Sequence, residues 1–165
     1  MNDRRTGTIH GVLVNIGGNG VLLTGPAGIG KSACALELVS RGHRLVSDDV
    51  VLVTRKGQKL IGSAPGDLAG KLAVRGLGIL DVRKLFGDKA SEVNAALDLC
   101  IDLRESGVIE PPDPIVPWAQ DLELLGVKVR SLVLPAGGGG HLATLVETAA
   151  SLVQNGAEPT KIAAA

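Results

Sequence analysis

The segment "GPAGIGKS", residues 25–32, matches the phosphate-binding pattern G-x-x-x-x-G-K-[ST]. Its glycines let backbone N–H groups converge on phosphate oxygens without obstruction by a Cβ atom. Its lysine supplies positive charge to the β- and γ-phosphates, and its serine hydroxyl is a ligand for Mg²⁺. The segment therefore predicts a P-loop nucleotide-binding domain that uses ATP and Mg²⁺. The residues expected to hold the nucleotide are Gly25, Pro26, Ala27, Gly28, Ile29, Gly30, Lys31 and Ser32, with Ser32 on the metal.

The sequence on both sides of this loop suits the motif. Residues 21–25 form a short apolar run, which is typical of a buried strand. Residues 31–42 have Ala35, Leu38 and Val39 at helical spacing, and Gly42 ends the predicted helix. A helix that begins near Lys31 directs its positive dipole end at a bound anion. A glycine-rich turn without a ligand is the alternative, but it leaves the Lys–Ser pair unexplained.

The rest of the chain predicts one α/β domain over residues 1–165 with a mixed sheet. Further strands are expected at residues 8–16, 43–53, 59–63, 97–103 and 126–135, and a second helix at about residues 142–154. Residues 65–87 are interrupted by glycines and predict short elements around a constrained loop at residues 75–78. Four prolines in residues 108–118 predict an extended loop, and residues 156–165 a frayed tail.

The composition argues against a nucleic-acid-binding protein and against a membrane-spanning one. The chain has 17 basic and 17 acidic side chains, whereas nucleic-acid binding needs a clustered basic excess. We expect no membrane helix, because no apolar run approaches roughly 18 residues, and no signal peptide. Cys34 and Cys100 lie in apolar contexts without metal-ligand spacing, which predicts buried thiols in a reducing cytoplasm.

Two adjacent acids, Asp48 and Asp49, follow Lys31 by 17 and 18 residues. That interval fits a helix, a turn and a strand, which would bring the acids to the sheet edge beside the phosphates. A P-loop enzyme needs a carboxylate near the metal and a group that takes the proton of a hydroxyl acceptor. Because adjacent strand residues face opposite sides, we expect separate roles for the two acids. His10 lies on a neighbouring predicted strand, where a lone histidine is usually structural.

Four motifs resemble the catalytic domain of the HPr kinase/phosphorylase family: HGVLV, GxxGIGKS, ALELVxRGHRLVxDD and RGLGILDVRKLFG. The resemblance is strong over about residues 8–103 and weaker over residues 133–150. It implies a sheet like that of phosphoenolpyruvate carboxykinase, a short single-domain form and a homo-oligomer, commonly a hexamer. It also implies an enzyme that phosphorylates a seryl hydroxyl of the phosphocarrier protein HPr with ATP or pyrophosphate and Mg²⁺. The same enzyme would remove that phosphate by phosphorolysis.

The resemblance also assigns roles to single residues. Asp49 falls on the family's catalytic aspartate, the base of the forward reaction and the acid of the reverse one. His10 falls on an active-site histidine, and Arg75 is the basic member of a loop, residues 73–82, that serves both reactions. Asp48 is placed with the catalytic group, and whether it faces the metal or is structural stays open.

The chain departs from the family pattern at several positions. Ala73 stands where the family has a metal-ligating glutamate, and Ala27 and Ala33 stand where it usually has serine and glutamate. Two arginines that serve partner contact and phosphorolysis in the family find no counterpart. These departures favour the kinase reaction over phosphorolysis.

Two other functions remain open from the residues. A nucleotide-sensing or protein-interaction module is favoured by Ala73 and opposed by the retained Lys31 and Asp49. A small-molecule kinase would need a lid with arginines, but only Arg104 and Arg130 follow residue 103. The proline-rich loop is better suited to docking a protein.

Overall fold

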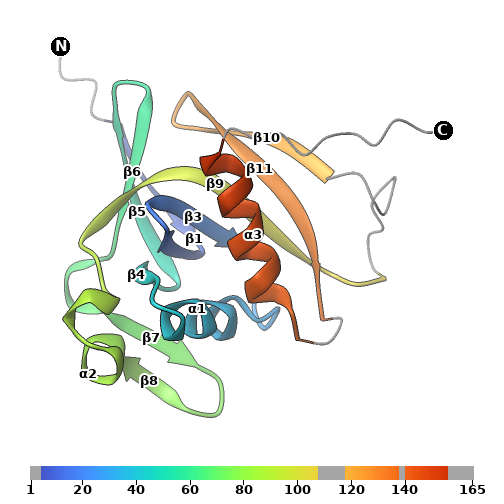
Figure 1. The fold of residues 1–165 in the computed structure, drawn as a ribbon. Coiled ribbons are helices and arrows are strands. Elements are labelled where there is room, and N and C mark those ends of the chain that lie inside the picture. Colours follow the sequence, from blue (N-terminus) through green and yellow to red (C-terminus); the bar gives the residue numbers. More distant parts are fainter. Residues whose placement is uncertain (1–4, 108–117, 138–139, 156–165) are drawn as a thin grey trace.

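A mixed sheet of nine strands organises the part of the chain that the computed structural model describes, residues 5–107, 118–137 and 140–155 (Figure 1). The strands are β1 (Thr6–His10), β2 (Val12–Ile16), β3 (Asn19–Thr24), β4 (Arg44–Ser47), β5 (Val50–Lys56), β6 (Lys59–Ser63), β9 (Asn94–Glu105), β10 (Trp118–Leu124) and β11 (Val127–Ala136). The long strand β9 pairs in parallel with both β3 and β11, whereas the other pairings are antiparallel. The predicted α/β class with a mixed sheet is confirmed.

The remaining elements lie beside this sheet. The helices are α1 (Lys31–Ser40), α2 (Val82–Phe86) and α3 (Leu142–Gln154), and the 3₁₀ turns are η1 (Gly66–Leu68) and η2 (Asp88–Ala90). A separate hairpin consists of β7 (Lys71–Val74) and β8 (Gly78–Asp81), and α2 follows it directly. Among the described residues, no helix is long and apolar enough to cross a bilayer.

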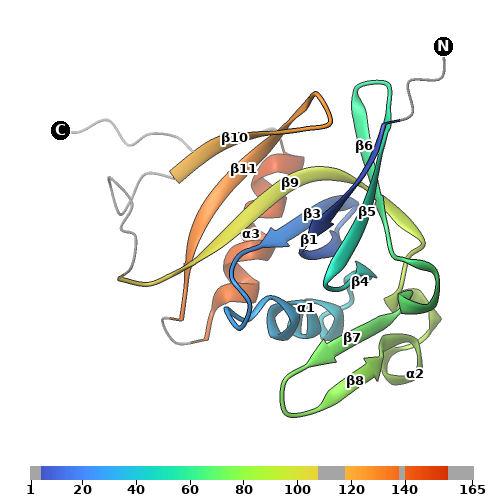
Figure 2. The ribbon, with the colours of Figure 1, turned by 180° about the vertical axis from the view of Figure 1, so that it is seen from behind.

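The hydrophobic core lies on both faces of the sheet. Helices α1 and α3 cover one face, where Val21 and Leu23 of β3 join the same cluster as Ala35 and Leu38 (Figure 2). Leu22 points to the other face and packs in a second cluster with residues of β5, β6 and β11. Because β3 is buried on both faces, its apolar run does not alternate with polar residues.

Two predicted strands are each divided in two, which corrects the expectation for residues 8–16 and 43–53. The first bends at Gly11, where an added Cβ would lie 2.6 Å from the carbonyl oxygen of Leu23. The second is interrupted at Asp48 and Asp49. In both cases the chain changes partners: β1 pairs with β5, whereas β2 pairs with β3 and β4.

Smaller differences concern the ends of elements and one missed strand. Helix α1 ends at Ser40 rather than near Gly42, and β9 is longer than the predicted residues 97–103. Strand β10 was not predicted, because its sequence WAQDLEL mixes charges with two leucines at an exposed edge. The proline-rich loop, up to residue 117, and the tail at residues 156–165 lie outside the described residues.

Candidate functional site

Residues 25–30 connect the end of β3 to the first turn of α1, and their backbone requires glycine. Gly25, Gly28 and Gly30 have positive φ values of 143°, 83° and 110°. An added Cβ on Gly25 would lie 2.6 Å from the carbonyl oxygen of Leu103 on the neighbouring strand β9. Gly30 is the N-cap of α1 in the left-handed region, so the helix begins at Lys31. The glycine spacing of the motif therefore matches the bends that this connection makes.

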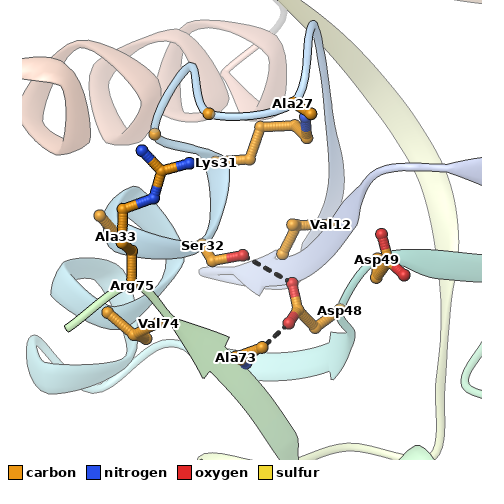
Figure 3. Close-up of a pocket in the computed structure, with 12 residues that line it drawn as sticks. Val12, Ala27, Lys31, Ser32, Ala33, Asp48, Asp49, Ala73, Val74 and Arg75 are labelled. Atoms are coloured by element: carbon orange, nitrogen blue, oxygen red, sulfur yellow. Dashed lines mark hydrogen bonds between the residues drawn. The ribbon is translucent and has the colours of Figure 1, made fainter. Parts of the chain in front are cut away.

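A cavity of about 470 Å³ opens beside this loop (Figure 3). Four segments form its walls: the start of β2, the loop with the start of α1, the two aspartates, and β7 with the turn after it. The lining residues are Val12, Ala27, Gly28, Gly30, Lys31, Ser32, Ala33, Asp48, Asp49, Ala73, Val74 and Arg75. The structure thus brings together eight residues that were selected from the sequence: Ala27, Gly28, Gly30, Lys31, Ser32, Asp48, Asp49 and Arg75.

Asp48 forms the buried wall of the pocket and is only 7% exposed. Its Oδ1 atom accepts a hydrogen bond of 2.9 Å from Ser32 Oγ on α1. Its Oδ2 atom accepts a hydrogen bond of 2.8 Å from the backbone N–H of Ala73 on β7. A buried carboxylate needs such partners, because an unpaired one loses its hydration without compensation. Asp48 therefore connects α1 to β7 across the pocket.

Asp49 lies at the open mouth of the pocket, in an environment opposite to the buried environment of Asp48. Its side chain is exposed and has no hydrogen-bond partner among the described residues, while its backbone oxygen accepts a bond of 2.9 Å from Gly11 N–H. Its φ of 68° is in the left-handed region, which is uncommon outside glycine and occurs often at functional sites. The expectation that strand alternation separates the two acids was wrong, because neither acid is in a strand.

Two cations flank the phosphate-binding motif. The Lys31 ammonium group donates hydrogen bonds to the backbone oxygens of Gly25, at 2.6 Å, and Pro26, at 3.0 Å. Arg75 follows β7, and its guanidinium lies 3.4 Å from the position that a Cβ on Gly28 would occupy. Figure 3 shows the Arg75 side chain directed toward the loop. The pocket therefore has positive charge on the loop side and carboxylates on the opposite side.

Some residues selected from the sequence lie outside the pocket lining. His10 is exposed at the end of β1, opposite Val50, the first residue of β5 and the residue that follows Asp49. Gly25 and Pro26 contribute carbonyl groups to Lys31, and Ile29 packs against the first core cluster. Sequence reasoning gave no separate role to Val12, which lies in the HGVLV motif, or to Val74, which lies in the loop at residues 73–82, because their apolar character gave no signal beyond that of core residues.

Comparison with known proteins places the chain in a family. Residues 4–163 match the family model described as HPr Serine kinase C-terminal domain. The chain belongs to this family. It is 42% identical over 144 residues to the HPr kinase/phosphorylase of Alkaliphilus metalliredigens, a match that covers 87% of this chain and 47% of that protein. The HPr kinase/phosphorylase of Caldicellulosiruptor bescii is 44% identical over 144 residues, covering 87% of this chain and 46% of that protein.

The fold is also similar to a solved structure, the HPr(Ser) kinase/phosphatase of Coxiella burnetii. The TM-score is 0.83 and the sequences are 38% identical, with 91% of this chain and 90% of that chain covered. The chain spans about half the length of the curated relatives that it matches. The match therefore concerns the C-terminal half of those longer HPr kinase/phosphorylases.

The oxygen donors in the pocket of this HPr serine kinase C-terminal domain fit a magnesium ion that arrives with a nucleotide. Mg²⁺ usually binds one or two carboxylates together with substrate phosphates and water. Ser32 Oγ and the Asp48 carboxylate lie within 2.9 Å of each other and provide such donors. Within residues 5–107, 118–137 and 140–155, no three His, Cys, Asp or Glu side chains cluster as a ready-made metal site. Ala73 contributes only its backbone N–H to Asp48.

Proposed function

We propose that this chain is the catalytic part of an ATP- and Mg²⁺-dependent kinase that phosphorylates a seryl hydroxyl of the protein HPr. Membership in the HPr serine kinase C-terminal domain family supports the acceptor. The observation that carries the reaction is the position of Asp49, an exposed carboxylate that shares one cavity with Lys31 and Ser32 of the glycine loop.

The proposed reaction is a direct phosphoryl transfer. Asp49 accepts the proton of the seryl hydroxyl, and the seryl oxygen forms a bond to the γ-phosphorus of ATP. The bond from that phosphorus to the β–γ bridging oxygen breaks, and the oxygen leaves with the electron pair as part of ADP. Lys31 and the loop N–H groups hold the phosphates, and Arg75 stabilises the negative charge of the transferring group.

Ser32 and Asp48 are the residues that would hold Mg²⁺ against the phosphates. When bound, the ion neutralises charge on the β- and γ-phosphate oxygens. Phosphorolysis of the phosphoserine, with release of pyrophosphate, is the reverse of a transfer from pyrophosphate and would use Asp49 as the acid. A homo-oligomer, a hexamer by resemblance, and a sheet like that of phosphoenolpyruvate carboxykinase stay predictions.

The test is transfer of label from γ-labelled ATP with Mg²⁺ to purified HPr, using the 165-residue chain. HPr in which the acceptor serine is replaced by alanine is the control. We expect label on the serine-bearing form alone. If ATP binds but neither form is labelled, the kinase proposal fails, and a nucleotide-sensing or protein-interaction module becomes the better description.

A further inference from the structure

Two charged residues near the end of β9, Asp102 and Arg104, do not line the candidate pocket but lie beside the start of its glycine loop. Figures 1 and 2 show β9 next to β3, and the parallel register places Asp102 opposite Thr24. Thr24 is the last residue of β3, and Gly25, the first glycine of the loop, follows it. The end of β9 therefore borders the point at which the chain leaves the sheet to form the loop.

The Asp102 carboxylate connects two side chains, one at each of its oxygens. Its Oδ1 atom accepts a hydrogen bond of 3.2 Å from the Thr24 hydroxyl. Its Oδ2 atom accepts from the Arg104 guanidinium, with Nε at 2.8 Å and Nη2 at 2.6 Å. Charged hydrogen bonds of this kind are short and directional, so they fix the orientation of the carboxylate. Arg104 thereby keeps the other oxygen directed at Thr24.

The backbone of β9 restrains the next residue, Gly25, as well. A Cβ atom on Gly25 would lie 2.6 Å from the carbonyl oxygen of Leu103. The Gly25 carbonyl in turn accepts a hydrogen bond of 2.6 Å from the Lys31 ammonium. Consecutive residues of β9 thus contact Thr24 and Gly25, and Gly25 holds the lysine of the phosphate-binding motif. A displacement of Thr24 would reach Lys31 through a single intervening residue.

A metal-binding role is the alternative for Asp102, because P-loop enzymes hold Mg²⁺ with the loop serine and an aspartate. In this chain the Ser32 hydroxyl donates to Asp48. Both oxygens of Asp102 are engaged by other groups, one of them by a guanidinium whose positive charge disfavours a second cation. The contacts therefore favour a role of Asp102 in holding the loop.

Arg104 also has an electrostatic effect on the loop. Without it, the negative charge of Asp102 would lie beside a loop that is expected to bind a triphosphate, and like charges repel each other. The Arg104 side chain is 44% exposed and that of Asp102 21%, so water and salt screen this effect in part. The ion pair places a carboxylate next to the loop while leaving little net charge there.

We propose that Asp102 is a positioning residue of the phosphate-binding loop, which it holds through the Thr24 hydroxyl, and that Arg104 neutralises its charge. This inference rests on the proposed function, because it requires that the loop bind ATP. It assigns a role to two residues outside the pocket lining, neither of which contacts the nucleotide itself.

The test measures Kd for ATP with Mg²⁺ after Thr24→Val, which keeps the branched shape of the side chain and removes its hydroxyl. We expect Kd to rise about three- to tenfold, whereas kcat for transfer to HPr at saturating ATP should change by less than about twofold. In an Asp102→Ala background Thr24→Val should have no further effect, because the hydrogen bond is already absent. In an Asp102→Asn background it should still weaken binding, because asparagine keeps an acceptor oxygen. Thr54→Val on β5 is the matched control and should bind ATP like the wild type.

Arg104→Gln tests the charge separately. Binding of ATP should weaken about two- to fivefold at low salt, because the Asp102 carboxylate is then unneutralised. The loss should shrink between about 0.01 M and about 1 M salt, because salt screens the repulsion. The matched control is Arg44→Gln, since Arg44 is 46% exposed and lies 3.6 Å from the Glu92 carboxylate on the other side of the sheet.

Three results would overturn the proposal. The first is an unchanged Kd for ATP in a Thr24→Val chain whose unfolding temperature matches the wild type. The second is an equal effect of Thr24→Val with and without Asp102→Ala, which would show that the hydroxyl acts without the carboxylate. The third is a loss in Arg104→Gln that does not depend on salt. If the wild type binds ATP but phosphorylates no serine of HPr, the proposed function fails, and the pattern of ATP affinities still decides the role of Asp102.

Discussion

The buried wall and the open mouth of the pocket are formed by two adjacent aspartates, yet these differ in burial, backbone conformation and hydrogen bonding. Asp48 is 7% exposed, and both of its oxygens accept hydrogen bonds from other elements. Asp49 is exposed, has a left-handed backbone and has no side-chain partner among the residues described. The turn in the backbone therefore buries the Asp48 carboxylate among hydrogen-bond partners and leaves the Asp49 carboxylate exposed at the pocket.

The substitution Asp49→Asn should have the largest effect. It removes the proposed base, so phosphoryl transfer should fall by roughly 10²- to 10⁴-fold. Asparagine tolerates the left-handed backbone, so folding and ATP binding should remain close to wild type. Transfer to HPr and binding of a fluorescent ATP analogue are the two measurements. Equal loss of both would show that Asp49 binds the nucleotide rather than the acceptor proton.

We expect the second-largest effect when the positive charge of Lys31 in the loop is removed. Lys31→Ala should weaken ATP binding about 10- to 100-fold, because it removes the charged hydrogen-bond donor that we propose for the phosphates. The exposed Lys89, in η2, provides the control Lys89→Ala, which should bind ATP normally. Calorimetric titration with ATP and Mg²⁺ measures both. Unchanged affinity in Lys31→Ala would mean that the lysine stays with the carbonyls of its own loop.

The structural role of Asp48 in the buried wall is tested by measuring the free energy of unfolding rather than the reaction rate. Asp48→Ala leaves Ser32 Oγ and Ala73 N–H without their acceptor, so the free energy of unfolding should fall by about 1–3 kcal/mol. Asp48→Asn keeps one acceptor oxygen and should lose less. Urea unfolding monitored by circular dichroism provides the values. If Asp49→Ala destabilises the protein more than Asp48→Ala does, the assignment of the structural role to Asp48 rather than to Asp49 is wrong.

The substitution Ala73→Glu tests whether the pocket wall lacks a carboxylate ligand for Mg²⁺. Ala73 is exposed and lines the pocket, so a longer side chain can enter the cavity while the N–H bond to Asp48 remains. Mg²⁺ affinity in the presence of ATP should rise by up to roughly tenfold. Leu77→Glu adds the same charge outside the pocket lining and serves as the control. If both variants raise the affinity equally, added negative charge explains the gain better than a new ligand.

The smallest effect concerns a thiol of α1. Burial, followed by the nearby Glu37 carboxylate, raises the pKa of Cys34 to about 12. Below the pKa of the unfolded thiol, both states are protonated and the full stability is present. As the pH rises above about 9, the unfolded thiol ionises first, so stability should fall by about 1 kcal/mol by pH 10.

The comparison with Cys34→Ala isolates this contribution from other groups that titrate in the same range. Urea unfolding of both proteins at pH 7 and pH 10 gives the difference in pH dependence. An identical pH dependence in the two proteins would show that the Cys34 thiol ionises as easily in the native state as in the unfolded chain.

The sequence alone determined the features that depend on a few neighbouring residues. Glycine spacing and the Lys–Ser pair predicted the bend into α1, helical periodicity predicted α1 and α3, and alternating element types predicted a mixed sheet. The proximity of Lys31, Ser32, Asp48 and Asp49 also followed from their intervals in the chain. Their chemical roles stay predictions.

Only the tertiary structure decided where strands exchange partners and which acid is buried. Position 11 has no room for a side chain because the carbonyl of Leu23 lies beside it, and the chain turns at Asp48 and Asp49 between β4, which pairs with β2, and β5, which pairs with β1. Asp48 is satisfied by groups 16 residues before it and 25 residues after it in the sequence. Such choices depend on contacts between segments that are distant in the chain, and no local pattern of residues encodes them.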